Sequence, residues 1–140
     1  MKSDVEIKKF VRGKIKGSDL ERAVTGKLSD KGRPNGSEKE DIVISVLSNE
    51  GAGQIQQAFV NVNIYVKDQW NAETKAWEEH TKRTGKLCEL SKFLFSIRGG
   101  DYHTVPSECG QKVNPTNVAF EDGHTEHFIN NKLYIEINNE

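Results

Sequence analysis

The stretch Gln57-Ala58-Phe59-Val60-Asn61-Val62-Asn63-Ile64-Tyr65-Val66 alternates residue by residue between two kinds of side chain. In a β-strand, such alternation places the two kinds on opposite faces of the sheet. One face would carry only small or branched apolar residues, which predicts packing on a core. The other face would carry Phe59, Asn61, Asn63 and Tyr65 and would be wet or would pack on a partner. The stretch therefore predicts a long strand that is buried on one side.

The residues on either side of this strand predict its neighbours. Ile42 to Leu47 are nearly continuous in apolarity and rich in β-branched residues, and Asn49 to Gly53 carry a turn signal. These two features predict a hairpin with the long strand. Further along the chain, Asn71 can cap a long helix that runs to about Arg98 on a 3.6-residue period, with Trp77 in its packed face.

The C-terminal third predicts a second group of strands. Residues 101–116 contain Pro106, Gly110 and Pro115, which indicates an extended or looping stretch. A short strand is expected at residues 117–120, followed by an Asp-Gly turn signal. The last strand is expected from Glu126 to Ile137, with a bulge at residues 130–131.

Two helix-start signals occupy the N-terminus. Ser3 and Glu6 have the spacing of a capping box, and Ser18 and Glu21 repeat it. We therefore expect an N-terminal helix that breaks near Gly17 and a short helical turn after it. The whole order predicts one α+β domain over residues 1–140, in which a mainly antiparallel four- to five-stranded sheet packs with an N-terminal helix and one long central helix.

Composition and charge narrow the function classes. The chain has 140 residues, 29% of them charged, and a net charge of -1. No apolar run is long enough to span a membrane and no export signal opens the chain, so we expect neither a membrane partner nor secretion.

Residues 1–39 carry 11 Lys and Arg against 6 Asp and Glu, a net of +5, whereas residues 40–140 carry 9 against 15, a net of -6. Aromatic residues are not interleaved with the basic ones, so specific nucleic-acid binding is not expected.

Residues with catalytic or metal-binding potential form no recognisable constellation. The thiols of Cys88, on the predicted helix, and Cys109, in the predicted loop, are expected to stay reduced, and no nucleophile motif surrounds them. His124 and His127 are three residues apart, so on a strand their rings would point to opposite faces, whereas on a hairpin turn they could converge. Zinc needs three or four ligands, and no further convergent set is evident. The adjacent carboxylates Glu40 and Asp41 are interpreted as solvated charges. We therefore expect no enzyme activity, no cofactor and no metal site.

One pattern resembles a known family. Thr25-Gly26-Lys27-Leu28, then Arg33-Pro34 with Ser37, then Glu40-Asp41-Ile42-Val43-Ile44 lead into the long alternating strand. This order is similar to the small tail-completion proteins of tailed phages and prophages, a group that includes the tail terminators related to the minor tail protein of lambda-like phages. The expected order of an N-terminal helix, a hairpin, a long helix and a C-terminal hairpin follows the same plan over most of the chain.

The resemblance implies a non-enzymatic structural protein of the virion tail, which would be in the bacterial cytoplasm during assembly. Members of the family form a ring, commonly of six subunits, that caps the tail tube, ends its polymerisation and helps to join head and tail. The implied partners are further copies of the chain, the tail tube protein and a neck or head-completion protein. A closed ring needs two different complementary patches on each subunit, which the basic N-terminal third and the acidic remainder would supply.

Six residues are the candidates for these interfaces. Arg33 and Asp41 precede the first long strand, Asn61 and Asn63 lie on the polar face of the second, and His124 and His127 lie near the last hairpin. The alternative interpretation is a small bacterial binding domain or enzyme subunit with an unknown ligand. That alternative predicts a pocket lined by convergent polar groups.

Overall fold

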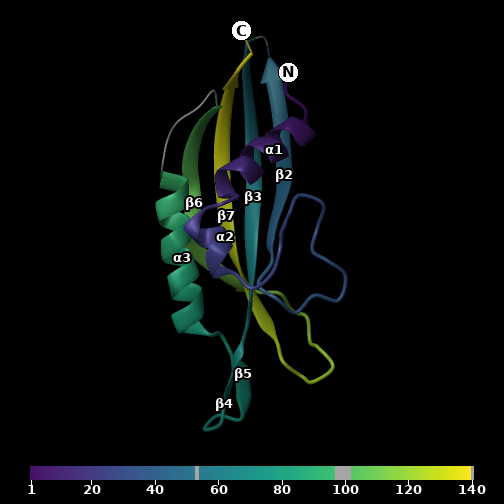
Figure 1. Cartoon of the computed structure of the whole chain (residues 1–140), viewed down its shortest axis with the longest axis vertical. Helices are drawn as coiled ribbons and strands as arrows, with labels where there is room; N and C mark the ends of the chain where they lie inside the picture. Colours follow the sequence, from purple (N-terminus) through teal and green to yellow (C-terminus); the bar gives the residue numbers. More distant parts are fainter. Residues whose placement is uncertain (53, 97–101, 140) are drawn as a thin grey trace.

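A mixed five-stranded sheet runs the length of the molecule (Figure 1). The computed structural model describes residues 1–52, 54–96 and 102–139. The strand order is β1-β2-β3-β7-β6. The bounds are β1 Leu28–Ser29, β2 Ile42–Ala52, β3 Ile55–Lys67, β6 Tyr102–Pro115 and β7 Glu126–Asn138. The predicted hairpin is confirmed as β2 and β3, but the turn predicted at Asn49–Gly53 is wrong for its first four residues, because Asn49 to Ala52 pair with β3.

The sheet departs from the antiparallel expectation at one edge. All other neighbouring strands are antiparallel, but β1 runs parallel to β2, with Leu28 opposite Ile42 and Ser29 opposite Val43. A parallel neighbour needs a crossover of about a dozen residues between the two strands. Residues 30–41 provide that crossover, which is why this turn-rich segment lies against the end of the sheet.

Three helices lie on one face of the sheet. They are α1 Asp4–Ile15, α2 Asp19–Ala23 and α3 Thr81–Ser96. In Figure 1, α1 and α2 cross in front of the sheet and α3 runs beside β6. The predicted capping box is confirmed, because the backbone N–H of Glu6 donates to Ser3 Oγ at 3.2 Å and the Glu6 carboxylate accepts from the Ser3 backbone. No helix within the described ranges combines the length and apolarity that crossing a membrane requires.

The core lies between the helices and this face of the sheet. The predicted apolar face of β3 is confirmed, since Ala58, Val60, Val62 and Ile64 are each 0% exposed. Helix α1 contributes Ile7, Val11 and Ile15 to the core, at positions i, i+4 and i+8. Val5 lies on the exposed side of that helix. The other buried apolar residues are Leu20, Ile42, Ile44, Val66, Leu87, Leu94, Phe95, Cys109, Ile129, Leu133, Ile135 and Ile137.

The long helix predicted from Asn71 is wrong in its first third. Residues 69–78 instead form a second, two-stranded sheet, with β4 Gln69–Asn71 and β5 Ala76–Glu78, that projects from one end of the molecule (Figure 1). Asn71 Oδ1 does accept backbone N–H bonds, from Glu73 at 2.9 Å and from Thr74, but these bonds close a hairpin turn. Trp77 lies directly across from Trp70, with 5.5 Å between the ring centroids. The helix proper begins at Thr81.

The looping stretch predicted for residues 101–116 is largely the edge strand β6. Its prolines are tolerated because an edge strand needs donors on one side only. The bulge lies in this strand and not at residues 130–131, since pairing with β7 shifts register between Pro106 and Lys112. Gly110, with φ of 68°, lies inside the irregular part, and its N–H donates to the buried Asn131 side chain at 2.7 Å. The strand predicted at 117–120 is irregular and belongs to the connection between β6 and β7.

Candidate functional site

The first part of the pattern that carries the family resemblance lies in residues 25–41, called here the motif segment, which precede β2. Its two ends lie side by side: the N–H of Gly26 donates to the Glu40 carbonyl at 3.0 Å, and the N–H of Lys27 donates to Asp41 Oδ1 at 2.9 Å. A Cβ atom at position 26 would lie 2.3 Å from Asp41 Oδ1 and 2.6 Å from the Glu40 carbonyl oxygen. Only glycine fits this approach.

Arg33 is the centre of a buried ion-pair cluster in the same place. Its Nε lies 2.9 Å from Asp41 Oδ2, and its Nη1 lies 2.7 Å from Glu126 Oε1 at the start of β7. Asp41 and Glu126 are 1% and 4% exposed. The guanidinium also donates to the Lys39 carbonyl and lies 4.2 Å from the centroid of the Tyr65 ring. The cluster therefore ties the motif segment to both β3 and β7.

The cluster shifts the pKa values of its members in opposite directions. Burial by itself would raise the pKa of Asp41, but hydrogen bonds from Ser37, the Lys27 backbone and Arg33 hold it below its ordinary value. Burial would lower the pKa of Arg33, and the bonds to Glu126 and Asp41 raise it instead. The interpretation of Asp41 as a solvated charge is therefore wrong.

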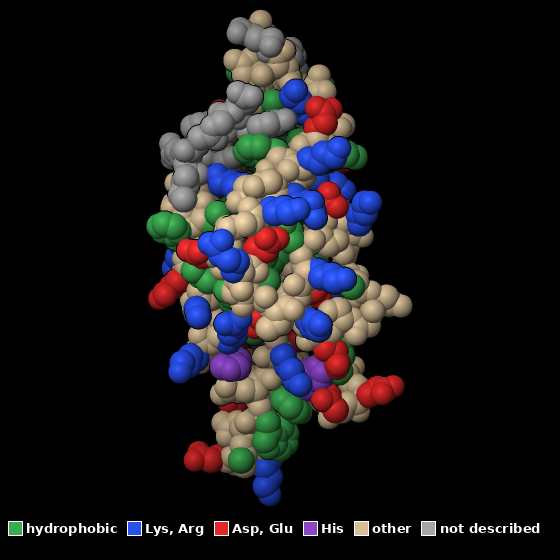
Figure 2. Space-filling model, in the orientation of Figure 1, with side chains coloured by type: hydrophobic (Ala, Val, Ile, Leu, Met, Phe, Trp, Pro, Cys, Tyr) green, Lys and Arg blue, Asp and Glu red, His purple; other side chains and the backbone are tan. Residues whose placement is uncertain are grey.

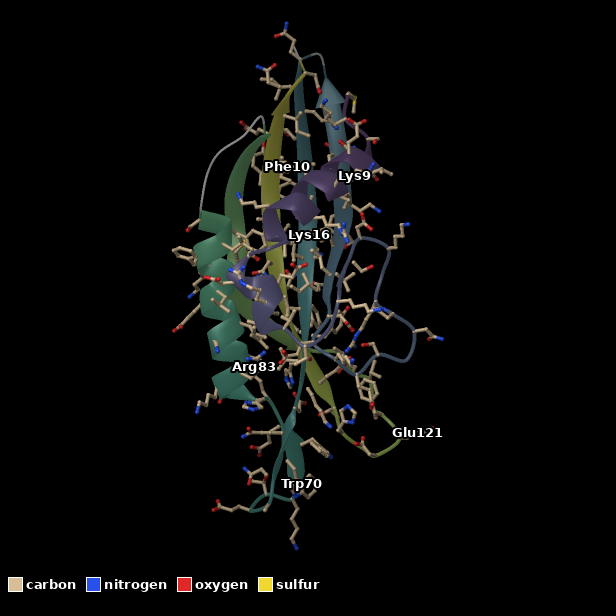
Figure 3. The ribbon with its side chains drawn as sticks, in the orientation of Figure 1. Lys9, Phe10, Lys16, Trp70, Arg83 and Glu121 are labelled. Carbon is tan, nitrogen blue, oxygen red and sulfur yellow. The ribbon has the colours of Figure 1, made fainter. Side chains whose placement is uncertain are left out.

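A second ion pair joins the motif segment to the helices. Arg83, labelled in Figure 3, reaches from α3 to Glu40 with both Nε and Nη2 at 2.7 Å from the carboxylate oxygens. Its Nη2 also donates to the Ala23 carbonyl at the end of α2. Glu40 is half-buried and also accepts the N–H of Thr25. The motif segment is thus clamped by two arginines, one from within it and one from α3.

Asn61 and Asn63 lie on the face of the sheet opposite the helices, as predicted, and both are half-buried. Asn63 Oδ1 accepts a bond from Asn130 of β7 at 2.7 Å, while Asn61 Oδ1 is buried without a hydrogen-bond partner. Aromatic pairs from β3 and β7 lie on either side of the amides. The ring centroids are 5.1 Å apart for Phe59 and Tyr134 and 6.1 Å apart for Tyr65 and Phe128. Aromatic side chains are enriched at protein interfaces.

His124 and His127 bind different carboxylates and do not converge. His127 Nδ1 lies 2.6 Å from Asp68 Oδ1, and Asp68 is 4% exposed. A recess of about 360 Å³ opens beside this pair and is lined by Trp77 and residues of the β6–β7 connection. The His124 ring is 1% exposed and bonds Asp122. In the single chain, Asp41 and His124 thus make intrachain contacts and offer almost no surface to a partner.

Both cysteines are free thiols in protected positions. Cys109, on β6, is buried, and its burial raises the pKa of the thiol to about 12. Cys88, on α3, is half-buried, and burial raises its pKa as well. A thiol that stays protonated is a poor nucleophile. Neither cysteine has the environment of a catalytic residue.

Basic and acidic side chains are interspersed over the face of the molecule that Figure 2 shows. Lys9, on α1, and Lys16, just after it, are exposed, with the half-buried Arg12 between them. We call these three residues the basic patch. Glu38, Glu121 and Asp122 are exposed on two loops near the other end of the molecule, and we call them the acidic patch. Figure 3 shows Lys9 and Lys16 on the helix side and Glu121 at the tip of the β6–β7 connection.

The sequence was compared with models of known protein families and with curated proteins, and neither comparison returned a match.

Several residues of the site were not predicted. The sequence predicts Glu126 only as the first residue of a strand, and no sequence pattern singles out Asp68 or Glu38. Each of these carboxylates contacts a basic side chain that is far away in the sequence. Glu126 contacts Arg33, Asp68 contacts His127, and Glu38 lies near His124. No local pattern reports such pairs. The one local signal is Glu126, an isolated carboxylate at the start of an apolar strand, because a buried carboxylate needs a cationic partner.

Proposed function

We propose that this chain is a non-enzymatic structural protein of a phage or prophage virion. Copies of it would close into a ring that caps the tail tube, ends tube polymerisation and helps to join head and tail. The contacts would be to further copies of the chain, to the tail tube protein and to a neck or head-completion protein.

The observation that carries the proposal is the convergence of the motif residues. Thr25, Gly26, Arg33, Glu40 and Asp41 are spread over 17 positions, yet they form one bonded unit at the start of β2. A chance likeness of short patterns would not require its members to contact one another. Their mutual dependence supports the view that the pattern marks a shared fold, as the resemblance to tail-completion proteins implies.

The surface supports assembly between unlike patches. A ring forms from heterologous contacts, in which one patch of each subunit meets a different patch of the next. The basic patch and the acidic patch are two groups of exposed or half-buried side chains of opposite charge on one molecule. Complementary charges of this kind steer association and suppress wrong pairings. The aromatic and amide-lined sheet face adds a surface with interface-like composition.

The first experiment is light scattering after size exclusion across protein and salt concentration, with negative-stain imaging of large species. A ring with a central hole, whose mass is a whole multiple of 15.8 kDa, is expected. If the chain is monomeric, purified tail tubes are added and imaged. Density at one tube end supports the proposal, whereas a monomer that leaves both tube ends bare refutes it.

A pair of charge-reversal variants tests the patches. K9E/K16E reverses two charges of the basic patch and is expected to weaken assembly and reduce its dependence on salt. The matched control is K82E/K86E, which makes the same charge change on the exposed side of α3. Assembly that responds equally to both variants would show that net charge, and not the basic patch, controls it. EDTA is present in these measurements so that bound metal ions do not contribute to assembly.

One observation favours the alternative of a small binding domain. The recess of about 360 Å³ beside Asp68 and His127 has the volume of a small-ligand pocket and includes Trp77 in its lining. Its polar groups are bonded to one another, however, since Asp68 also accepts the Thr125 hydroxyl. A thermal-shift screen of small molecules tests the alternative, and H127Q should abolish any shift that arises in this recess.

A further inference from the structure

His124 lies beside two aromatic rings. Its imidazole stacks on Phe120 at a centroid distance of 4.2 Å and an interplanar angle of 2°. Trp77 of β5 approaches from another side, with 5.9 Å between centroids and an edge-on geometry. The His124 side chain is 1% exposed, so the ring has one orientation and little contact with water.

The two ring nitrogens of His124 have different surroundings. Nδ1 lies within hydrogen-bond distance of Asp122 Oδ1, which also accepts the His124 backbone N–H at 3.0 Å. A carboxylate accepts only, so Nδ1 carries the proton in this pair. Nε2 of a neutral ring then presents a lone pair. That atom is buried without a hydrogen-bond partner.

An unpaired buried acceptor is costly, and the nearest polar group does not relieve the cost. Glu38 Oε1 lies 3.6 Å from Nε2, and a carboxylate cannot donate to a lone pair. A metal cation between the two atoms would satisfy both of them. Two ligand atoms that each lie about 2.0–2.1 Å from a tetrahedral zinc ion are about 3.3 Å apart, close to the observed separation.

We propose that His124 and Glu38 bind a divalent transition-metal ion of the zinc class. The protein ligands are His124 Nε2 and the Glu38 carboxylate, with water in the remaining positions. These are fewer than the three or four protein ligands of the usual zinc sites, so we expect weak binding. Asp122 acts as a positioning residue, because a carboxylate on the far nitrogen is the usual support of a metal-bound histidine. Ligand atoms of all three residues lie within 4.8 Å of one another.

The arrangement has a structural meaning for the two loops. Glu38 belongs to the motif segment, whereas Asp122 and His124 belong to the β6–β7 connection. Glu38 is exposed and lies on an irregular stretch, so its carboxylate has room to complete the approach. The ion would join loops that are 84 residues apart in sequence at Glu38 and Asp122, and it would neutralise part of the acidic patch.

The test uses the full chain without an affinity tag. Zn²⁺ is titrated by calorimetry, and Co²⁺ is titrated with its visible absorption and the tryptophan fluorescence of the chain as readouts. We expect one saturable ion per chain, a Co²⁺ spectrum typical of nitrogen and oxygen ligands, and quenching of the tryptophan that lies beside His124. Zinc is also expected to raise the melting temperature, because it binds only the folded state.

Variants separate this site from general surface binding. E38A is expected to lose saturable binding, and D122A to weaken it by about 10- to 100-fold, the usual effect of removing the partner of a metal-bound histidine. E121A removes a neighbouring exposed carboxylate of the same loop and should bind like the natural chain. Because H124Q removes a buried ring, its folding is checked by circular dichroism, and the conclusion does not depend on it.

Two results would overturn the proposal. The first is binding that persists unchanged in E38A, which would place the ion elsewhere on the chain. The second is the absence of saturable binding by the natural chain.

Discussion

Replacing Arg33 with methionine tests whether the buried ion-pair cluster holds the motif segment in place. Methionine keeps much of the volume of the arginine stem but removes the guanidinium. Asp41 and Glu126, at 1% and 4% exposed, then lose their cationic partner. Asp41 keeps its hydrogen bonds from the Ser37 hydroxyl and the Lys27 backbone N–H. Glu126 loses its ion pair with Arg33.

Removing one partner of a buried ion pair costs about 3–5 kcal/mol. The Arg33 side chain is 17% exposed, so water can reach part of the gap, and the two remaining bonds to Asp41 reduce the loss. We therefore expect the free energy of unfolding to fall by about 3 kcal/mol. A chain of this size would melt about 10 °C lower as a result.

The assay is urea unfolding at pH 7, followed by tryptophan fluorescence and circular dichroism. The control is R22M, because Arg22 pairs with Asp19 at the surface and both side chains are more than two-thirds exposed. Exposed ion pairs contribute about 0–1 kcal/mol. If R33M loses no more stability than R22M, the cluster does not stabilise the fold and the reasoning is refuted.

The pH dependence provides a second measurement on the same pair of proteins. The pKa of Asp41 is lowered in the folded chain, so its contribution to stability is present above the ordinary carboxylate pKa and is lost as pH falls through the lowered value. R33M removes one of the groups that lower this pKa. The stability difference between natural chain and variant should therefore be largest near pH 7 and should shrink below about pH 4.

Further predictions concern single residues. Because burial raises the pKa of both thiols, iodoacetamide at pH 8 should label the folded chain slowly, Cys88 before the deeper Cys109, and mass spectrometry that finds Cys109 labelled first would contradict the burial order. G110A should destabilise by about 1–3 kcal/mol in urea unfolding, because φ is +68° and the added Cβ would lie 2.3 Å from the Cys88 carbonyl oxygen. G85A should stabilise by up to about 1 kcal/mol, since the new methyl group on α3 meets nothing within 4 Å, and a loss of stability would contradict this. S3A should cost about 1 kcal/mol through the lost helix cap, and an unchanged melting temperature would contradict the capping argument.

The parts of the fold that were predictable are those with a strict local period. The alternation from Ala58 to Val66 identified β3 and its buried face residue by residue. Ser3 and Ser18 identified two helix starts because a hydroxyl cap acts on N–H groups only a few positions away. Each of these signals is complete within about ten residues of chain.

The errors arose where a local signal had two structural uses. Asn71 has the side chain of a helix cap, but the same oxygen closes the turn between β4 and β5. Pro106 and Gly110 are typical of loops, and an edge strand with a bulge tolerates both. The contacts of Glu38 and Glu126 join loops and strands that only the fold brings together, so no single stretch of sequence predicts them.

The order of strands in the sheet has a consequence for biosynthesis. β7 follows every other strand in the sequence, yet it lies between β3 and β6 and supplies the partner that both of them need. Translation delivers about 5–20 residues per second, so β3 and β6 spend seconds outside the ribosome before β7 emerges. During that time β2 and β3 form a hairpin with an unfinished edge, and β6 has no strand to join. Any premature stop before Glu126 would therefore remove the middle of the sheet and release an aggregation-prone fragment.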